Sequence, residues 1–324
     1  MQAITYHHYG TPDVLSFAET SKPVPAADEV LIRVQAAAVN PYDWHFVRGA
    51  PKFIRLFTGV GHPRFSGVGA DMAGVVESAG GKVTRFKPGD AVFGMAKGAF
   101  AEFACGRESQ LALKPQGIGF EQAASLPIAG VTALQALRDR ARVLPEQSVL
   151  INGAAGGVGT FAVQIAKMLR AEVTGVCSTH NVDLVRSLGA DRAIDYTRED
   201  FTRSPDRYDV IFDLVGNRSL KELRRVLRPR GVLVSCGGGG PDTSSAKMLW
   251  WMLGKMLVAP FTSQKLKGVL AKINTEDLNK LGAWMESGQL VPVIDRRFKL
   301  REVPDAIRYV EQCHAHGKVT IAVA

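Results

Sequence analysis

A glycine-rich stretch near the middle of the chain carries the clearest chemical signal. It runs Asn152-Gly153-Ala154-Ala155-Gly156-Gly157-Val158-Gly159-Thr160, after the strand-like run 149–151 and before a helix-like run that starts at Phe161. Glycines let such a turn approach a pyrophosphate closely, and the helix that follows offers free N–H groups and partial positive charge to the anion. A strict GxGxxG pattern would need glycine at position 154. The flanks favour a dinucleotide site over a purely structural strand–helix turn, and its contacts are expected from residues 154–159.

The end of the next predicted strand indicates which dinucleotide is bound. An acidic residue at this point usually holds the ribose 2′-hydroxyl of NAD. Here the strand ends in Ser178, Thr179 and His180, and none of them is acidic. An acid would repel a 2′-phosphate, so its absence predicts NADP(H) over NAD(H). The two hydroxyl residues could also cap the following helix.

Several further motifs accompany the glycine-rich turn along nearly the whole chain. They are Val39-Asn40-Pro41-Tyr42-Asp43, Gly69-Ala70-Asp71-Met72-Ala73-Gly74-Val75-Val76, Lys87-Pro88-Gly89-Asp90-Ala91-Val92-Phe93-Gly94, Gly98-Ala99-Phe100-Ala101-Glu102-Phe103, Ala129-Gly130-Val131-Thr132-Ala133 and Gly317-Lys318-Val319. In this arrangement the sequence resembles the medium-chain dehydrogenase/reductase superfamily, and more closely its zinc-free, zeta-crystallin-like quinone oxidoreductase branch.

The resemblance implies four candidate catalytic residues. Asn40 would lie in the active cleft, where its amide could bind cofactor or substrate, although a turn role before proline is equally open. Asp43 would orient a neighbour or a water, or simply cap a helix. Relatives often have tyrosine where this chain has His45. His45 and Tyr42 are therefore competing candidates for a proton donor, and a structural role for His45 stays open.

The resemblance also implies further cofactor contacts. Thr132 matches a threonine near the nicotinamide ribose, and Tyr196 matches a tyrosine beside the adenosine 2′-phosphate. Helix packing and an ordinary strand-end aromatic are their structural alternatives. Small residues after two later strands would leave room for the cofactor at the carboxyl edge of the sheet, and these are Val215, Gly216, Cys236, Gly237 and Gly238.

Zinc is not expected. In zinc alcohol dehydrogenases a cysteine, a histidine and a second cysteine hold the catalytic metal, and the matching positions here are Asn40, Ala70 and Ile128. Three zinc ligands cannot be built from these side chains. Without that Lewis acid, alcohol oxidation is disfavoured, whereas reduction of an electron-poor acceptor needs less help.

Two kinds of element must position these residues. Short strands separated by Gly/Pro/Lys turns fill the first part of the chain, which predicts a small antiparallel barrel or sandwich. From about residue 120, strands and helices alternate, which predicts a doubly wound parallel sheet of the Rossmann type. Together with the resemblance, these patterns imply a GroES-like catalytic domain from 1–122 and 289–324, and a Rossmann dinucleotide-binding domain at 123–288.

Composition adds exclusions and one open question. The 324 residues, 46% of them hydrophobic, are ordinary for a folded protein, and the net charge of +9 indicates a surface rich in lysine and arginine, because no dense basic block is visible. Four widely spaced cysteines and no secretory signal favour a cytoplasmic location. The apolar segment 247–258 could form a buried or homodimer-interface helix, a substrate lid, or a membrane-touching patch.

The sequence therefore predicts an NADPH-dependent enzyme that transfers hydride to a quinone or an α,β-unsaturated carbonyl. Two alternatives remain at this point. One is an NADPH-binding structural, regulatory or RNA-binding protein with little catalysis, although no nucleic-acid-binding motif is visible and no nucleic acid is expected as a partner. The other is a zinc-free alcohol or aldehyde dehydrogenase.

Overall fold

The computed structural model describes residues 1–236 and 262–323, which form two compact units. Unit 1 contains Met1–Val131 and Lys272–Ala324, and unit 2 contains Thr132–Ala271. Gly237, Gly238 and the segment 247–258 lie outside the described residues, so the expectations for them stay predictions. No helix among the described residues is long and apolar enough to cross a membrane.

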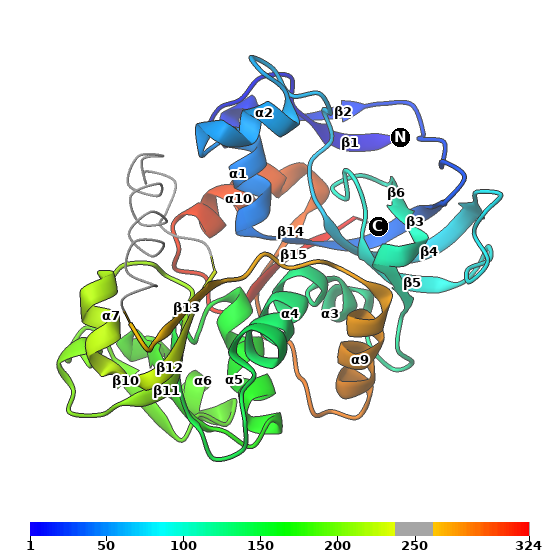
Figure 1. Cartoon of the computed structure of the whole chain (residues 1–324). Helices are drawn as coiled ribbons and strands as arrows, with labels where there is room; N and C mark the ends of the chain where they lie inside the picture. The colour runs from blue at the N-terminus through cyan, green and yellow to red at the C-terminus, as the bar shows by residue number, and fades with distance from the viewer. Residues whose placement is uncertain (237–261, 324) are drawn as a thin grey trace. The chain divides into compact units, whose positions relative to one another are not determined.

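Unit 1 is built on a largely antiparallel sheet in the order β14-β15-β3-β4-β5-β7, with β6 paired to β3 (Figure 1). Its long central strand, β3, joins segments from both ends of the chain. A separate hairpin-like pair, β1 and β2, adds two strands. The strands are β1 (Gln2–Thr5), β2 (Ser16–Glu19), β3 (Glu29–Val39), β4 (Asp71–Ala79), β5 (Ala91–Met95), β6 (Phe103–Arg107), β7 (Leu111–Leu113), β14 (Ile294–Lys299) and β15 (Lys318–Ala322).

Short helices flank this sheet. Their bounds are α1 (Pro41–Arg48), α2 (Arg55–Thr58), α3 (Phe120–Ala124), α4 (Pro127–Leu134), α9 (Thr275–Glu286) and α10 (Val303–Glu311). Helix α10 packs on α1, β14 and β15. Fully buried apolar side chains from β3, β4, α1 and α10, such as Ile32, Met72, Val47 and Ile307, form one continuous core. Burial of this kind stabilises a fold by about 25 cal/mol for each Å² of apolar surface.

Unit 2 contains a six-stranded sheet in the order β10-β9-β8-β11-β12-β13, and every neighbouring pair is parallel. In chain order this is 3-2-1-4-5-6, the arrangement of doubly wound dinucleotide-binding sheets. The prediction of a Rossmann-type parallel sheet is confirmed. The strands are β8 (Ser148–Asn152), β9 (Glu172–Cys177), β10 (Arg192–Asp195), β11 (Tyr208–Asp213), β12 (Leu227–Ser235) and β13 (Lys265–Gly268).

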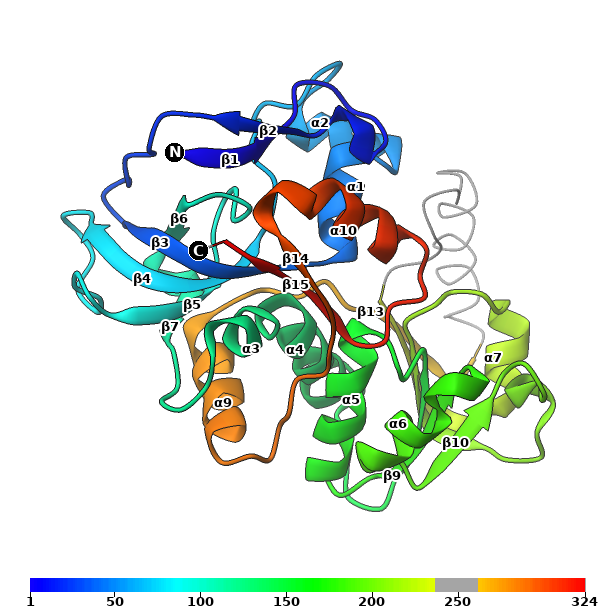
Figure 2. The ribbon, with the colours of Figure 1, turned by 180° about the vertical axis from the view of Figure 1, so that it is seen from behind.

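Helices connect these strands. Helix α5 (Gly157–Met168) packs on β8 and β9, and α6 (Val182–Ser187) packs on β9 and β10 (Figure 2). Helix α7 (Leu220–Val226) packs on β12. The sequence predicts a helix over 217–228, but α7 begins after its N-cap Ser219 and the chain is extended from Leu227 onward. A π-helical stretch, Gln135–Ala141, follows α4.

The boundary between the units differs from the expected 123–288. Helix α3 packs on β3 and β4, so residues 120–124 belong to unit 1. Helix α9 belongs there too, because it packs on β7 and the Thr275 hydroxyl donates to the carbonyl of Leu111 over 2.9 Å. Helical periodicity places both segments with the α/β alternation, whereas long-range packing places them with the antiparallel sheet.

Candidate active site

Four buried polar side chains form a cluster in unit 1. They are Asn40, Asp43, Asp71 and Lys318, with exposed fractions of 2%, 2%, 0% and 3%. Charged side chains are almost never buried this completely unless they are paired. We call this set the Lys318 cluster.

Strand register brings the cluster together. Asn40 directly follows β3 and caps the start of α1, while Asp71 opens β4 and Lys318 opens β15. Strand β3 lies between the other two, with Ala38 opposite Asp71 and Val39 opposite Val319. Two sheet ladders therefore align residues that are far apart in the sequence.

Hydrogen bonds hold the ammonium of Lys318 in place. Its Nζ donates to Asn40 Oδ1 and to the carbonyl of Val39 at 3.3 Å, and it lies 3.7 Å from Asp71 Oδ2. Asn40 Nδ2 donates to Asp71 Oδ2 over 2.9 Å and to the carbonyl of Ala38 over 3.3 Å. The amide of Asn40 is thus turned inward. Its two N–H groups are both used, so its main effect is to hold the other members of the cluster.

Asp71 receives a third kind of partner. The backbone N–H of Ile128 donates to both carboxylate oxygens of Asp71, at 3.1 and 3.2 Å. Burial raises the pKa of Asp71 to about 6, against the opposing effects of the Lys318 ammonium and the Asn40 amide. Burial also lowers the pKa of Lys318, while the attraction of Asp71 and Asp43 opposes that shift. Each charge is therefore tolerated because the other is present.

Asp43 is the least satisfied member of the cluster. Its Oδ2 accepts the backbone N–H of Asn40 at 2.7 Å, which is the helix-capping contact considered from the sequence. Its Oδ1 is buried and has no hydrogen-bond partner. Burial raises the pKa of Asp43 to about 8. At neutral pH the group is therefore mostly a neutral acid, which can donate a hydrogen bond from a buried position.

Tyr42 and His45 lie on the same helix but in different surroundings. The ring of Tyr42 packs on Phe46 with centroids 4.2 Å apart, and burial raises its pKa to about 12. The ring of His45 stacks on Trp44, and its Nδ1 lies 2.7 Å from the carbonyl of Ala50. A carbonyl only accepts, so Nδ1 carries the proton. Burial lowers the pKa of His45, which leaves a neutral ring with an accepting Nε2.

A cavity of about 440 Å³ adjoins the cluster within unit 1. Tyr42 and Asp43 line it on one side and Gly69 and Ala70 on another. Aromatic side chains make up much of the remaining wall, and they include Tyr6, Phe46, Phe57 and Phe65. This lining suits a flat, conjugated molecule of modest size.

In unit 2, the predicted glycine-rich turn joins β8 to α5. Gly153 has a φ of +92°, and a Cβ there would lie 2.9 Å from Val215 Cγ2. A Cβ on Gly159 would lie 2.1 Å from the carbonyl oxygen of Gly153. The turn therefore requires glycine at both positions. It delivers the chain to α5, whose first N–H groups have no acceptor within the helix.

The carboxyl ends of β8 and β11 meet at the point where the strand order reverses, the usual ligand position in such sheets. Asn152 Nδ2 donates to Asp213 Oδ1 over 2.9 Å, and the N–H groups of Val215 and Gly216 donate to the same oxygen. Asp213 is 1% exposed, and its Oδ2 has no hydrogen-bond partner among the described residues. This edge thus brings together a glycine turn and a helix N-terminus.

The residues at the carboxyl end of β9 include no acid, but an acidic residue of the neighbouring strand lies beside that end. Asp195 ends β10 opposite Cys177, and its Oδ2 accepts the hydroxyl of Thr179 at 2.6 Å. The carboxylate also accepts from Thr197, and Arg198 lies 3.4 Å away. These donors lower the pKa of Asp195. The expectation that no acidic residue lies at the end of β9 therefore holds only for residues 178–180. The pairing of β9 with β10 brings the Asp195 carboxylate to the same end, although Asp195 is distant from it in the sequence.

The other predicted cofactor residues are distributed as follows. Ser178 accepts a hydrogen bond from Asn181 Nδ2 at 3.0 Å, a contact of the local turn, and His180 is exposed. Tyr196 is 48% exposed next to Asp195. Thr132 is buried within α4. Cys236 directly follows β12, and its N–H donates to the carbonyl of Asp213. Within unit 2 the structure thus gathers residues 153–159, 213–216 and 236 at the carboxyl edge, while 178–180 and 196 share the β9–β10 end. The set 40–45 belongs to unit 1.

Two members of the Lys318 cluster, Asp71 and Lys318 itself, are absent from the residues that the sequence predicts for the site. A usable signal exists for Lys318, which opens the otherwise apolar strand 319–323 directly after Gly317. Asp71 stands at the start of an equally apolar strand. No group of three or more His, Cys, Asp or Glu side chains that could hold a metal ion occurs in the part of the chain that the structure describes.

Comparison with known proteins gives a consistent result. Residues 26–135 match the alcohol dehydrogenase GroES-like domain and residues 188–321 match the zinc-binding dehydrogenase family. The chain is 36% identical to the tomato (Solanum lycopersicum) 2-methylene-furan-3-one reductase and to the chloroplastic NADPH-dependent alkenal/one oxidoreductase of Arabidopsis thaliana. Each match covers 99% of this chain and 79% of that protein. The quinone oxidoreductase of Coxiella burnetii superposes with a TM-score of 0.86 at 31% identity, over 100% of this chain and 99% of the other.

A parallel sheet with a dinucleotide edge, coupled in one chain to an antiparallel unit with a buried polar cluster, defines a two-domain oxidoreductase fold. The chain belongs to the medium-chain dehydrogenase/reductase superfamily, in the group of quinone oxidoreductases and alkenal reductases. This confirms the resemblance and the two-part fold class predicted from the sequence.

Removing the ammonium of the cluster should destabilise the protein strongly. Lys318→Met leaves Asp71 buried without its cation, and we expect a loss of about 3–5 kcal/mol in the free energy of unfolding. Adding Asp71→Asn should recover part of this loss, because the uncompensated carboxylate is then gone. Urea unfolding measures both effects, with the exposed Lys82→Met as the matched control. A Lys318→Met protein as stable as the wild type would contradict the argument.

The raised pKa of Asp43 predicts a pH effect with a definite sign. The folded state holds this proton up to about pH 8, whereas the unfolded chain releases it near pH 4. Stability is therefore complete at low pH and falls as pH rises through this range, by at most about 1.4 kcal/mol per pH unit. Asp43→Asn keeps an acceptor for the Asn40 N–H and should flatten the slope between pH 6.5 and 8. Equal slopes for the two proteins in urea titrations would refute this.

Proposed function

We propose that this protein is an NADPH-dependent reductase of quinones or α,β-unsaturated carbonyl compounds. The observation that carries the proposal is the carboxyl edge of unit 2, where the glycine turn and the N-terminus of α5 lie at the point where the strand order reverses, an arrangement that fits a dinucleotide. The match to an NADPH-dependent alkenal/one oxidoreductase supports the same chemistry. When bound, the nicotinamide supplies the hydride, and the chain positions and shields the reactants.

The side chains of unit 1 do not fit a catalytic zinc. Of the three positions that would supply ligands, Ala70 offers a methyl group and Ile128 an alkyl group, while Asn40 is held by Lys318 and Asp71. The buried ammonium of Lys318 would also repel a second cation. We therefore propose that the protein works without zinc, which favours acceptors that are already polarised by conjugation.

The aromatic cavity of unit 1 supports a conjugated acceptor. Its walls bring tyrosine and phenylalanine rings together with the backbone of Gly69 and Ala70, so a planar ring can stack without losing hydrogen bonds. Arg64 and Lys97 also line this cavity, and Lys97 Nζ lies 5.0 Å from the ring centroid of Phe65. These cations favour carbonyl oxygens, on which negative charge increases during reduction.

The geometry favours Tyr42 over His45 as the proton donor. Tyr42 lines the cavity and is 37% exposed, its hydroxyl has no hydrogen-bond partner among the described residues, and its raised pKa keeps it protonated. The Nδ1–H of His45 donates to the carbonyl of Ala50, so the other ring nitrogen, Nε2, can only accept a hydrogen bond. The role predicted for His45 stays a prediction, and we propose Tyr42 for the transfer.

NADP(H) is the proposed cofactor, and Asp195 modulates this preference. Asp195 is the acid at the carboxyl ends of β9 and β10, and its carboxylate interacts with Thr179, Thr197 and Arg198. A carboxylate engaged in this way repels a 2′-phosphate less than a free one. The Thr179 hydroxyl donates to Asp195, and a cofactor contact of Thr179 stays a prediction.

We also propose a cellular location and an oligomeric state. Cys105, Cys177, Cys236 and Cys313 are all free thiols, which supports a reducing, cytoplasmic location. A homodimer is proposed from the apolar segment 247–258, which lies outside the described residues. Sedimentation of the purified protein tests the oligomeric state directly.

Turnover assays test the proposed reaction and its donor together. With NADPH, the protein should reduce quinones and enones, and it should not oxidise alcohols with NADP⁺. Tyr42→Phe should lower kcat for enones by about tenfold to a hundredfold with little change in KM, because the proton donor is lost. His45→Gln, which keeps an N–H for Ala50, serves as the matched control and should retain the wild-type rate.

The reductase activity and the assignment of Tyr42 as proton donor can fail separately. Tight NADPH binding without NADPH oxidation across a broad quinone and enone panel would refute the reductase. A Tyr42→Phe protein with the wild-type kcat would refute only the assignment of the donor.

Cofactor choice is tested by fluorescence titration with NADPH and NADH. The wild type should bind NADPH more tightly. Asp195→Asn removes a negative charge near the predicted 2′-phosphate position, and it should raise the preference for NADPH by roughly threefold to tenfold. Asp209→Asn makes the same charge change at the amino edge of the sheet and should leave the preference as it is. An unchanged ratio in Asp195→Asn would rule out this role.

A further inference from the structure

A second cavity lies in unit 2, on the edge of the sheet opposite the glycine turn. Its volume is about 520 Å³, and it is bounded by α7, by Arg207 before β11 and by Thr262–Gln264 before β13. The glycine turn instead follows the last residue of β8. A parallel strand of six residues spans roughly 20 Å, so the two sites are separated by about the height of the sheet.

Four cations line this cavity, and none of the described residues that line it carries a carboxylate. Lys221, Arg224 and Arg225 project from α7 at spacings of three and four residues, and Arg207 faces them from the loop before β11. Three of these cations lie within residues 221–225, and Arg207 is brought to them from a separate loop. Chain folding gathers them, and we call the set the α7 groove.

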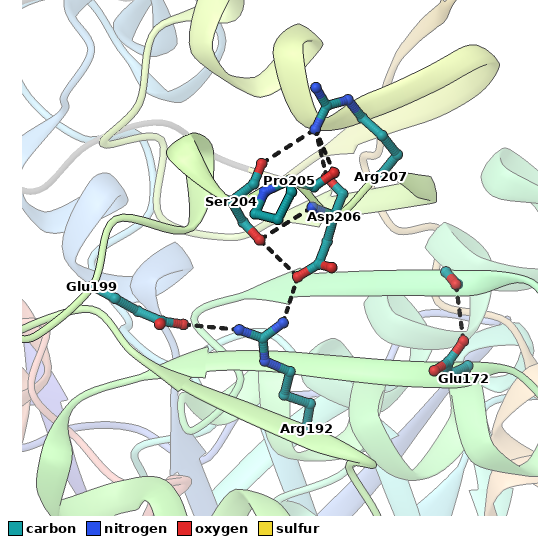
Figure 3. A network of polar contacts seen from close by, with 8 residues as sticks. Glu172, Arg192, Glu199, Ser204, Pro205, Asp206 and Arg207 are labelled. Atoms are coloured by element: carbon teal, nitrogen blue, oxygen red, sulfur yellow. Dashed lines mark hydrogen bonds and ion pairs between the residues drawn. The ribbon is translucent and has the colours of Figure 1, made fainter.

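The nearby acidic side chains are occupied elsewhere. Asp206 accepts the Ser204 hydroxyl at 2.6 Å and pairs with Arg192. Figure 3 shows Arg192 and Arg207 on opposite sides of this loop. Glu222, on α7 itself, accepts both the N–H and the hydroxyl of its N-cap Ser219. The positive charge of the groove is therefore not cancelled locally.

One side of the groove is held in place by Gln264. Its Oε1 accepts Arg224 Nε at 2.9 Å, and its Nε2 donates to the carbonyls of Arg224 and Leu227 at 3.0 and 2.8 Å. These bonds fix the guanidinium. They also occupy carbonyl oxygens at the end of α7 that would otherwise repel an anion.

The free donors of the groove match phosphate oxygens. Arg207 donates from Nη1 to the carbonyls of residues 204–206, and its Nε and Nη2 have no partner in the part of the chain that the structure describes (Figure 3). Lys221 and Arg225 are exposed and make no hydrogen bond or ion pair with the described residues. Guanidinium groups bind phosphate oxygens in pairs, and hydroxyl groups of Thr262 and Ser263 add neutral donors.

We propose that the α7 groove binds a small soluble ligand that carries two or more linked phosphate groups. Four cations gathered on one open groove exceed what a single phosphate needs, and an open groove admits a linear, highly charged ligand. The site is separate from the dinucleotide edge and does not depend on the proposed reductase activity.

Calorimetric titration with tripolyphosphate tests the proposal, with NADPH at saturation so that the dinucleotide site is filled. The wild type should bind one tripolyphosphate. Lys221→Ala/Arg225→Ala should weaken binding by about tenfold or more, because two charged contacts are lost. Lys82→Ala/Lys87→Ala in unit 1 makes the same change in net charge on exposed residues and should bind like the wild type. Thermal melting checks that both variants are folded.

Three results would overturn the proposal. The first is equal affinity in the two double variants, and the second is loss of all tripolyphosphate binding once NADPH is present. The third comes from sedimentation with vesicles of phosphatidylcholine and phosphatidylglycerol in equal parts. Binding to these vesicles, but not to pure phosphatidylcholine or to tripolyphosphate, would assign the groove to lipid headgroups instead of a soluble ligand.

Discussion

The buried ammonium of Lys318 is the constraint on which unit 1 depends. An ammonium without water needs acceptors on several sides, and here three acceptors come from two distant parts of the chain: the carbonyl of Val39 and the amide oxygen of Asn40 at the end of β3, and the carboxylate of Asp71 at the start of β4. Because Asp71 also accepts the N–H of Ile128, the same charge pair ties β15, β3, β4 and the start of α4 together. A charge pair of this kind costs desolvation energy, so its value lies in fixing positions more than in net stability.

That fixed position explains how helix α1 is presented. Asn40 is both a member of the cluster and the N-cap of α1, so the helix starts at a point set by Lys318. Tyr42 and Asp43 then reach the aromatic cavity from the first turn, while His45 is drawn toward Ala50. The position of the buried Lys318 ammonium thereby fixes which side chains of α1 face the aromatic cavity and which hydrogen-bond to the backbone.

The sequence predicted the parallel sheet and the glycine turn well, because both depend on local signals. Apolar runs, a turn that demands glycine at 153 and 159, and a following helix are all contiguous. It failed where strands that are distant in sequence lie side by side. Asp195 joins the end of β9 only through the β9–β10 ladder, and Lys318 meets Asp71 only through β3. Helix α9 shows the same limit at the level of domains, since its periodicity does not reveal the sheet on which it packs.

The two units treat unsatisfied charge in opposite ways, and this bears on function. In unit 1 the Lys318 ammonium is buried beside Asp43 and Asp71, and it counteracts the rise in their pKa values that burial causes. The carboxyl group of Asp43 nevertheless stays protonated, with one oxygen unpaired among the described residues, beside the aromatic cavity. In unit 2 the corresponding Asp213 oxygen is buried at the carboxyl end of β11, beside the glycine turn. Buried polar atoms without partners are rare in folded proteins. The described residues hold five of them, on Asp43, Tyr208, Asp213, Arg218 and Thr320, and Asp43 is the one whose residue lines the aromatic cavity, which makes its carboxyl group the best placed to meet a bound molecule.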